Sequence, residues 1–307
     1  MGGGTRDMRV GWLEHVAQKW KPVLRNNMRQ DEEIERGFDS IRTKRALATA
    51  CLVALLGLAG PAQASEGEEV DVAVVFAVDI SYSMDPEEQA LQKQGYVDAL
   101  NSPEVLQAIR SGMTGKIAIA YFEWANAFDQ RMVLPWTIID GPQSAKAATD
   151  RIGASPLRRS QRTSVSGAIN FGRTMLETVP YRAFRKVLDI SGDGPNNNGD
   201  LVEIARDKAI KAGIVINGLP IIVKRSTGYG WGDIDKLDQY YEDCVIGGPG
   251  AFMVAIRSRE QFLSATRSKI IREVADLGAR DVQYVQSDRP KSDCTVGERM
   301  HRERWGN

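Results

Sequence analysis

Apolar runs alternate with amphipathic stretches along most of the chain. The first run, residues 70–80, is continuously apolar in its second half, which is typical of a strand buried on both faces of a sheet. Asp85 is suited to cap a helix, and Pro86 and two glutamates follow it. Because these residues are favoured at a helix start, they predict a helix that ends near Asn101.

The same alternation continues to about residue 275. Further strands are predicted over residues 116–124, 186–191, 214–223 and 252–256, with residues 131–139 as an antiparallel edge strand. Helices are predicted over residues 143–152, from Thr163 or Ser164 to about residue 179, and over residues 201–212 and 259–275. Regular alternation of strand and helix predicts an α/β fold: a doubly wound, mainly parallel sheet with helices on both faces and one antiparallel edge strand.

The N-terminal region has the layout of a secretory signal peptide. Basic residues at 42, 44 and 45 precede an uncharged run, residues 46–60, and the sequence Pro-Ala-Gln-Ala ends at Ala64. The run is shorter than the roughly 20 apolar residues that a membrane-spanning helix needs. We therefore expect cleavage after Ala64 and export to the periplasm or the medium, with no stable membrane span after cleavage.

Two alternatives concern this leader. The charged stretch before Arg42 is long for a signal peptide, which also fits an uncleaved anchor. A true start at Met8 or Met28 would explain the same length. The predicted organisation is thus a leader over residues 1–64, one domain over residues 65–280 and a C-terminal tail over residues 281–307.

Charge and composition narrow the function classes. Beyond Ala64 the chain has 30 basic and 33 acidic residues. This balance gives no electrostatic basis for binding nucleic acid or an anionic membrane. The two histidines, His15 and His301, lie outside the predicted domain, which leaves it without a histidine for a zinc cluster or a Ser/His/Asp triad.

Two cysteines remain after cleavage, because Cys51 lies in the signal sequence. In an exported protein, Cys244 and Cys294 are a candidate disulfide that would tie the tail to the domain. A pair of unpaired thiols is the alternative, since two cysteines alone have no diagnostic spacing.

The candidate chemistry lies where the predicted strands end. In a doubly wound sheet, ligands bind beyond the carboxyl ends of the strands. The polar residues at these positions are Asp79, Ser81, Ser83, Thr163 and Asp193. Two carboxylates and three hydroxyls are hard oxygen ligands, which suit Mg²⁺, with Mn²⁺ or Ca²⁺ as alternatives. An ion held mainly by neutral hydroxyls keeps positive charge with which to attract an acidic group of a partner.

These residues resemble the metal-ion-dependent adhesion site (MIDAS) of the von Willebrand factor A family. Its D-x-S-x-S motif matches Asp79-Ile80-Ser81-Tyr82-Ser83, its distant threonine matches Thr163, and its Asp-Gly pair matches Asp193-Gly194. The resemblance covers about residues 70–275 and implies a Rossmann-like fold. Several short sequence segments also resemble a bacterial family of exported von Willebrand A-like proteins. This resemblance implies no activity. One departure is Ser191-Gly192, where the family often has a threonine before the aspartate.

We therefore expect an exported, noncatalytic binding protein that uses its cation to hold an acidic group of a protein or glycan. A metal-dependent, phosphatase-like hydrolase with Asp79 as nucleophile is the alternative. A structural domain with a vestigial site is a third possibility. The five polar residues could instead be ordinary helix caps, and the asparagine-rich loop 195–199 is either a partner surface or simple turn chemistry.

Overall fold

The computed structural model describes residues 67–223, 234, 236–275 and 290–305. The predicted leader and its cleavage site lie outside these residues. Five strands form one sheet in the order β3-β2-β1-β4-β5. Four are parallel: β1 (Glu69–Asp79), β2 (Ile117–Trp124), β4 (Arg182–Gly192) and β5 (Val215–Pro220). The edge strand β3 (Gln130–Ile139) is antiparallel to β2, as the sequence predicts.

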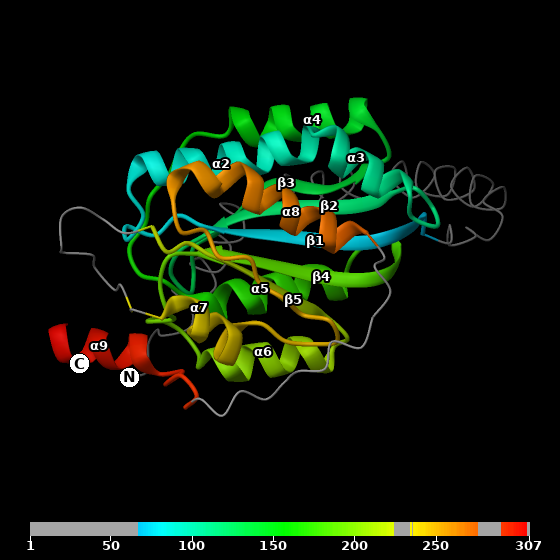
Figure 1. Cartoon of the computed structure of the whole chain (residues 1–307). Coiled ribbons are helices and arrows are strands. Elements are labelled where there is room, and N and C mark those ends of the chain that lie inside the picture. Colours follow the sequence, from blue (N-terminus) through cyan, green and yellow to red (C-terminus); the bar gives the residue numbers. More distant parts are fainter. Residues whose placement is uncertain (1–66, 224–233, 235, 276–289, 306–307) are drawn as a thin grey trace, which may run out of the picture. The chain divides into compact units, whose positions relative to one another are not determined.

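Helices cover both faces of the sheet (Figure 1). One face carries α2 (Pro86–Asn101), α3 (Pro103–Arg110), α4 (Pro142–Ala154) and α8 (Phe262–Val274), the last preceded by a 3₁₀ turn, Arg259–Gln261. The other carries α5 (Val165–Glu177), α6 (Val202–Lys211) and α7 (Leu237–Tyr240), which continues into a π-helical turn, Tyr241–Val245. The predicted doubly wound α/β fold is therefore confirmed.

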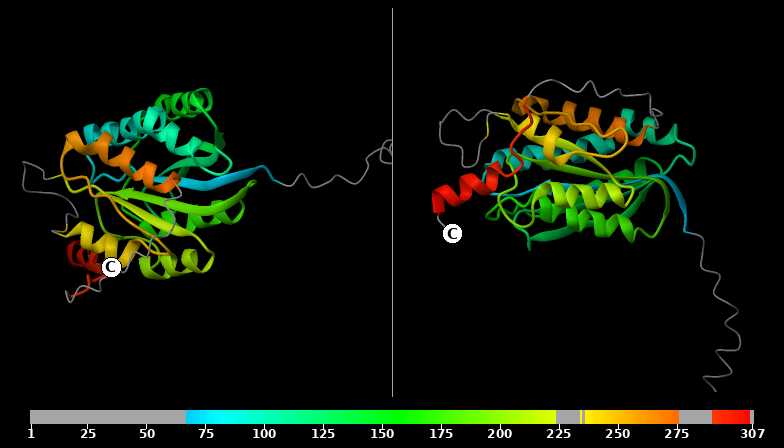
Figure 2. Two further views of the ribbon diagram at one scale, coloured as in Figure 1. Left: turned by 45° about the vertical axis from the view of Figure 1, so that its right-hand side comes forward. Right: turned by 90° about the horizontal axis from the view of Figure 1, so that it is seen from below.

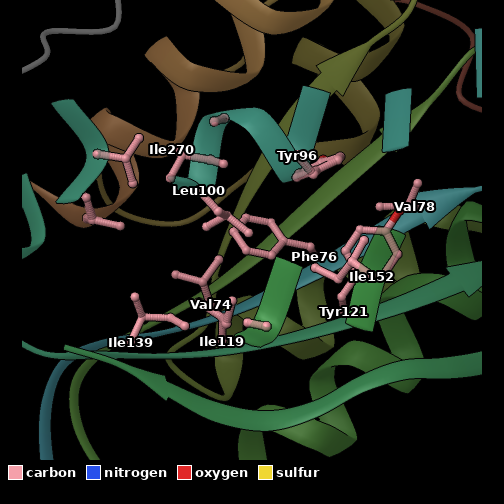
Figure 3. Packing of buried hydrophobic residues seen from close by; sticks show 14 of the residues in the cluster. Val74, Phe76, Val78, Tyr96, Leu100, Ile119, Tyr121, Ile139, Ile152 and Ile270 are labelled. Carbon is pink, nitrogen blue, oxygen red and sulfur yellow. The ribbon is translucent and has the colours of Figure 1, made fainter. Parts of the chain in front are cut away.

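The central strand β1 joins two hydrophobic cores. Its side chains alternate between faces, so Val74 and Phe76 pack under α2 while Val75 and Ala77 pack toward α5. Figure 3 shows the first core, where the ring of Tyr96 lies between those of Phe76 and Tyr121 at centroid distances of 5.2 and 5.6 Å. Burial on both faces explains why this strand reads as a continuous apolar run.

An ionic cluster lies within the core. Lys269 on α8 is fully buried, forms an ion pair with Asp189 on β4 at 2.5 Å, and also pairs with Glu273. Asn217 and Tyr96 donate hydrogen bonds to Glu273 and Asp189 respectively. Burial, together with the charge of Asp189, raises the pKa of Glu273 to about 7, against the lowering effect of Lys269. The single positive charge of Lys269 thus faces two buried carboxylates. Protonation of Glu273 removes the excess negative charge.

Three helices were not predicted from the sequence: α3, the short α7 and α9. Helix α3 begins directly after α2, where Ser102 accepts a hydrogen bond from the Val105 N–H and Pro103 takes the first helical position. Ser-Pro-Glu is a typical helix start, so this signal was present in the sequence. Helix α9 (Val296–Trp305) lies in the segment predicted only as a tail.

The strand predicted over residues 252–256 is wrong. Only isolated parallel bridges, Gly218↔Met253 and Ile221↔Ile256, join this segment to β5. The N–H of Gly218 donates to the Phe252 carbonyl and that of Ile222 to the Ile256 carbonyl. Between them lies Pro220, which has no N–H to continue the ladder. The segment therefore follows β5 without forming a full strand.

The predicted disulfide joins Cys244, in the π-helical turn, to Cys294, just before α9, with the α-carbons 5.5 Å apart. Figure 2 shows α9 in red beside the yellow α7 segment. Among the described residues, no helix is both long and apolar enough to cross a membrane.

Removing the disulfide tests how far it stabilises the domain. The Cys244→Ser/Cys294→Ser variant should lose about 2–4 kcal/mol of unfolding free energy, because the bond closes a loop of 50 residues. Urea denaturation measures this loss. A reductant should destabilise the wild type similarly and leave the variant unchanged. Equal stability of oxidised wild type and variant would contradict the expectation.

The ionic cluster predicts a pH dependence of stability. Because folding raises the pKa of Glu273 from its ordinary 4.5 to about 7, the folded state holds a proton that the unfolded state has lost between these values. This contribution is fully present below about pH 4.5 and disappears as pH rises through 7. Glu273→Gln should flatten that decline in urea-denaturation free energies measured from pH 4.5 to 8.

Lys269→Met leaves buried carboxylate charge unpaired. It should therefore lower the free energy of unfolding by about 3–5 kcal/mol, measured by the same urea denaturation.

Candidate functional site

Asp79 ends the central strand and is completely buried. Its Oδ1 accepts a hydrogen bond from the Ser81 N–H at 2.7 Å, which turns the chain sharply out of the sheet. Its Oδ2 has no hydrogen-bond partner among the described residues. Leaving a buried carboxylate oxygen unpartnered is costly, so this atom is an indication of a missing ligand.

The pairing of β1 with β4 brings the second aspartate to the same place. Val78 lies opposite Ser191 in the parallel register, so Asp79 faces Gly192 and Asp193 follows immediately. A Cβ on residue 192 would lie 2.8 Å from Asp79 Oδ2. Position 192, where the von Willebrand factor A family often has a threonine, therefore requires glycine here. Any side chain at this position would collide with the Asp79 carboxylate.

Hydrogen bonds then link the serines to Asp193. Ser81 Oγ and Ser83 Oγ lie 2.7 Å apart, and Ser83 Oγ donates to Asp193 Oδ1 at 2.5 Å. The loop that carries the serines is fixed from outside by Arg159, whose guanidinium donates to the carbonyls of Tyr82 and Met84. The motif's two serines and both aspartates thus converge at one edge of the sheet.

Thr163 is held against the loop that follows Asp193, which contains three consecutive asparagines. Asn197 accepts from the Thr163 N–H through Oδ1 and donates its own N–H to the Thr163 carbonyl. Asn196 Oδ1 accepts from the Ser166 N–H, and Asn198 Oδ1 from the Ala127 N–H. Thr163 Oγ1 lies 4.0 Å from where a Cβ on Gly194 would be. Loop 195–199 therefore joins the third part of the motif to the other two.

The helix caps are other residues. Asp85 caps α2, in a capping box with Glu88, and Ser164 caps α5 by accepting from the Gly167 N–H. Of the two capping candidates at α5, the structure thus selects Ser164. The hydroxyls of Ser81, Ser83 and Thr163 have no capping role at these helices, which removes the simplest structural explanation for them.

The electrostatics of the site are those of two like charges brought together. Burial, and then the neighbouring charge of Asp193, raise the pKa of Asp79 well above its ordinary value. Tyr241 lies beside this pair: its hydroxyl would be 3.0 Å from a Cβ on Gly192, and burial followed by the charge of Asp79 raises its pKa. A divalent cation would lower the cost of keeping both carboxylates ionised.

The donor set is chemically suited to such an ion. Among the described residues there is no group of three or more His, Cys, Asp or Glu side chains able to hold a metal. The donors here are two carboxylates and three hydroxyls, all oxygen, which is the preference of hard cations. The residues that would hold the ion are Asp79, Ser81, Ser83, Thr163 and Asp193.

A pocket of about 570 Å³ opens over these hydroxyls. Ser81, Ser83 and Thr163 contribute to its lining. So do residues that the sequence analysis did not assign to the site, among them Arg162 and four residues of the tail helix: Gly297, Met300, His301 and Arg304. His301, which the sequence places in the tail, thus lines the pocket. The even cysteine count was the signal in the sequence that the tail returns to the domain.

Comparison with solved structures finds the same fold in several proteins. The pilus adhesin SpaC from Lactobacillus rhamnosus GG is 10% identical with a TM-score of 0.50, over 68% of this chain and 31% of that one. Proximal thread matrix protein 1 from the mussel byssus, with a zinc-occupied MIDAS motif, is 15% identical with a TM-score of 0.48, over 67% and 46%. A von Willebrand factor type A structure from Catenulispora acidiphila is 16% identical with a TM-score of 0.46, over 67% and 43%.

This chain therefore spans about half the length of the mussel protein it matches. At 10% identity the likeness to the pilus adhesin shows the fold alone. Among curated proteins none matches the chain. A family model, described as "Protein of unknown function (DUF1194)", matches residues 69–278. Since that match spans more than half of the sequence, the chain belongs to this family.

Proposed function

We propose that this protein is an exported, noncatalytic binding protein that holds a Mg²⁺-type cation at Asp79, Ser81, Ser83, Thr163 and Asp193. When bound, the cation supplies positive charge to attract an acidic group of a protein or glycan partner. The observation that carries the proposal is the hydrogen-bonded chain from Ser81 through Ser83 to Asp193, with Thr163 lining the same pocket as the two serines. The second oxygen of Asp79 is buried and has no hydrogen-bond partner among the described residues.

The burial pattern supports a binding role for the hydroxyls. Ser81 and Thr163 are almost completely buried, and neither caps the neighbouring helix. Each hydroxyl can give an ion a neutral oxygen ligand, so the ion's charge is not cancelled by its own site. The carboxylates act through hydrogen bonds: Ser83 already donates to Asp193, and this contact orients the serine oxygen lone pairs.

Two further observations support the proposal. The mussel protein that shares this fold is described with zinc at its MIDAS motif, which favours a divalent ion here. The disulfide between Cys244 and Cys294 suits an oxidising compartment outside the cytoplasm. Mg²⁺ is our choice because all five donors are oxygen.

The first test concerns Asp79 and the ion. Isothermal titration calorimetry should detect Mg²⁺ binding to the wild type, and Asp79→Asn should lower the affinity at least tenfold. Without the ion, Asp79→Asn should be more stable than the wild type at pH 7. Because folding raises the pKa of Asp79, its ionisation destabilises the folded state as pH rises above the ordinary value of 3.8. Unchanged Mg²⁺ affinity in this variant would refute the site.

The second test separates ligands from helix caps. Thr163→Val keeps the side-chain shape and removes the hydroxyl, and it should weaken Mg²⁺ binding with little change in stability without the ion. Ser102→Ala is the control, because Ser102 caps α3 and contributes to no candidate ligand set. It should lose about 1 kcal/mol of unfolding free energy and keep its Mg²⁺ affinity. The reverse pattern would indicate that Thr163 has only a structural role.

A phosphatase assay tests the enzymatic alternative. Hydrolysis of a generic phosphate ester by the wild type that is lost in Asp79→Asn would favour that alternative.

A further inference from the structure

Helix α9 is anchored to the loop that follows Asp193. The Cys244–Cys294 disulfide fixes the chain just before the helix, and the Ser292 N–H donates to Asp243 Oδ2 at 2.8 Å. Within the helix, Glu298 Oε1 accepts from Asn196 Nδ2 at 2.6 Å. Gly297 lies so close that a Cβ there would be 2.0 Å from the Asn196 carbonyl oxygen. The sequence thus provides a covalent tether, a partly buried polar contact and a glycine where the two backbones meet.

One face of α9 forms a wall of the pocket over the candidate cation site. The pocket-lining residues of this helix recur at intervals of three and four, as one helical face requires: Gly297, Met300, His301 and Arg304. The same pocket is also lined by Ser81, Ser83 and Thr163. Access to the candidate cation site is therefore shaped by a helix that is distant from the motif in sequence.

The lining of this pocket is positively charged. Among the described residues that line it there are two arginines, Arg162 and Arg304, and no carboxylate. Arg162 precedes Thr163 directly, adopts a left-handed backbone φ of 72° and donates from its guanidinium to His301 Nε2. His301 therefore holds Arg162 toward α9 as a neutral acceptor. A cation at the five site residues would add a further positive centre at the floor of the same pocket.

Size and charge together point to a class of ligand. A volume of about 570 Å³ is in the range of small-molecule sites, whereas a protein partner docking on a surface patch buries roughly 800 Å² on each side. A guanidinium binds a carboxylate through two parallel hydrogen bonds. The pocket thus offers one position for an acidic group at the cation and a second at the arginines.

We propose that this pocket selects ligands with two carboxylates on a slender chain, one for the cation and one for Arg162 and Arg304. The inference rests on the proposed function, because it needs the cation site. It goes further by naming a small dicarboxylate, in place of a protein or glycan, as the ligand, and by giving the tail helix a role in selecting it.

Calorimetric titrations of the purified protein at saturating Mg²⁺ test the proposal. The probes are succinate, glutarate, adipate and pimelate, each compared with the monocarboxylate of equal carbon number. At least one diacid should bind about tenfold or more tightly than its monocarboxylate. The preference should disappear when Mg²⁺ is removed with a chelator. Equal affinity of diacids and monocarboxylates, or no binding of either, would overturn the inference.

Two arginines of α9 provide a matched pair of variants. Arg304 lines the pocket and Arg302 does not, yet both are exposed and lie near the end of the same helix. Arg304→Gln should remove most of the diacid preference and leave Mg²⁺ affinity unchanged, whereas Arg302→Gln should retain both. An equal loss in the two variants would mean that only general charge matters, which contradicts a built pocket.

The disulfide variant gives an independent arm. Cys244→Ser/Cys294→Ser frees the start of α9, so it should lose the diacid preference and keep Mg²⁺ binding. Full preference in this variant would contradict the role of the tethered helix. If the wild type binds no Mg²⁺ by calorimetry, the proposed function itself fails. If it binds Mg²⁺ without preferring any diacid, only the present inference fails.

Discussion

The parallel pairing of β1 with β4 is the contact on which the rest of the site depends. It brings the ends of the two strands together, so that Asp79 and Asp193 become neighbours although they are far apart in the chain. Burial raises the pKa of Asp79, and the nearby Asp193 carboxylate raises it further. The fold holds this unfavourable arrangement because β1 is packed on both faces and cannot move away from β4.

The surrounding structure maintains the same arrangement. Gly192 lets the backbone of β4 approach the Asp79 carboxylate, where any side chain would collide with it. The asparagines of loop 195–199 then bind the segments that start α5 and follow β2, through Ser166 and Ala127. These side chains mainly form hydrogen bonds inside the protein, which favours a structural role over a partner surface for most of the loop. Asn197 also lines the pocket.

The buried cluster of Lys269, Asp189 and Glu273 shows a different solution to the same problem. There the protein supplies its own cation from α8. Burial, and then the charge of Asp189, still raise the pKa of Glu273 to about 7, although Lys269 acts to lower it. At Asp79 and Asp193, hydroxyls take the place of a basic side chain. Both clusters include a residue on β4 or at its end, and a pocket lies beside the hydroxyls of the second cluster.

The sequence by itself determined the order of strands and helices and the residues of the motif. Apolar runs buried on both faces and strong capping residues are local signals, so residues 70–80 and the start at Asp85 were readable without tertiary information. The cysteine pair was also visible in the sequence as a candidate disulfide. Only the geometry of the folded chain could show that the two cysteines bond. The failed strand over residues 252–256 reflects a missing N–H at Pro220, a residue of the neighbouring strand that the segment's own sequence does not contain.

Only the tertiary structure decided which residues share a space. Whether Thr163 or Ser164 caps α5 depends on backbone angles at the helix start, and selecting Ser164 leaves Thr163 for the site. The position of α9 depends on a disulfide and on contacts with Asn196, all between residues distant in sequence. No local pattern in residues 296–305 encodes the surface they pack against, because that surface exists only after β1, β4 and α5 have assembled.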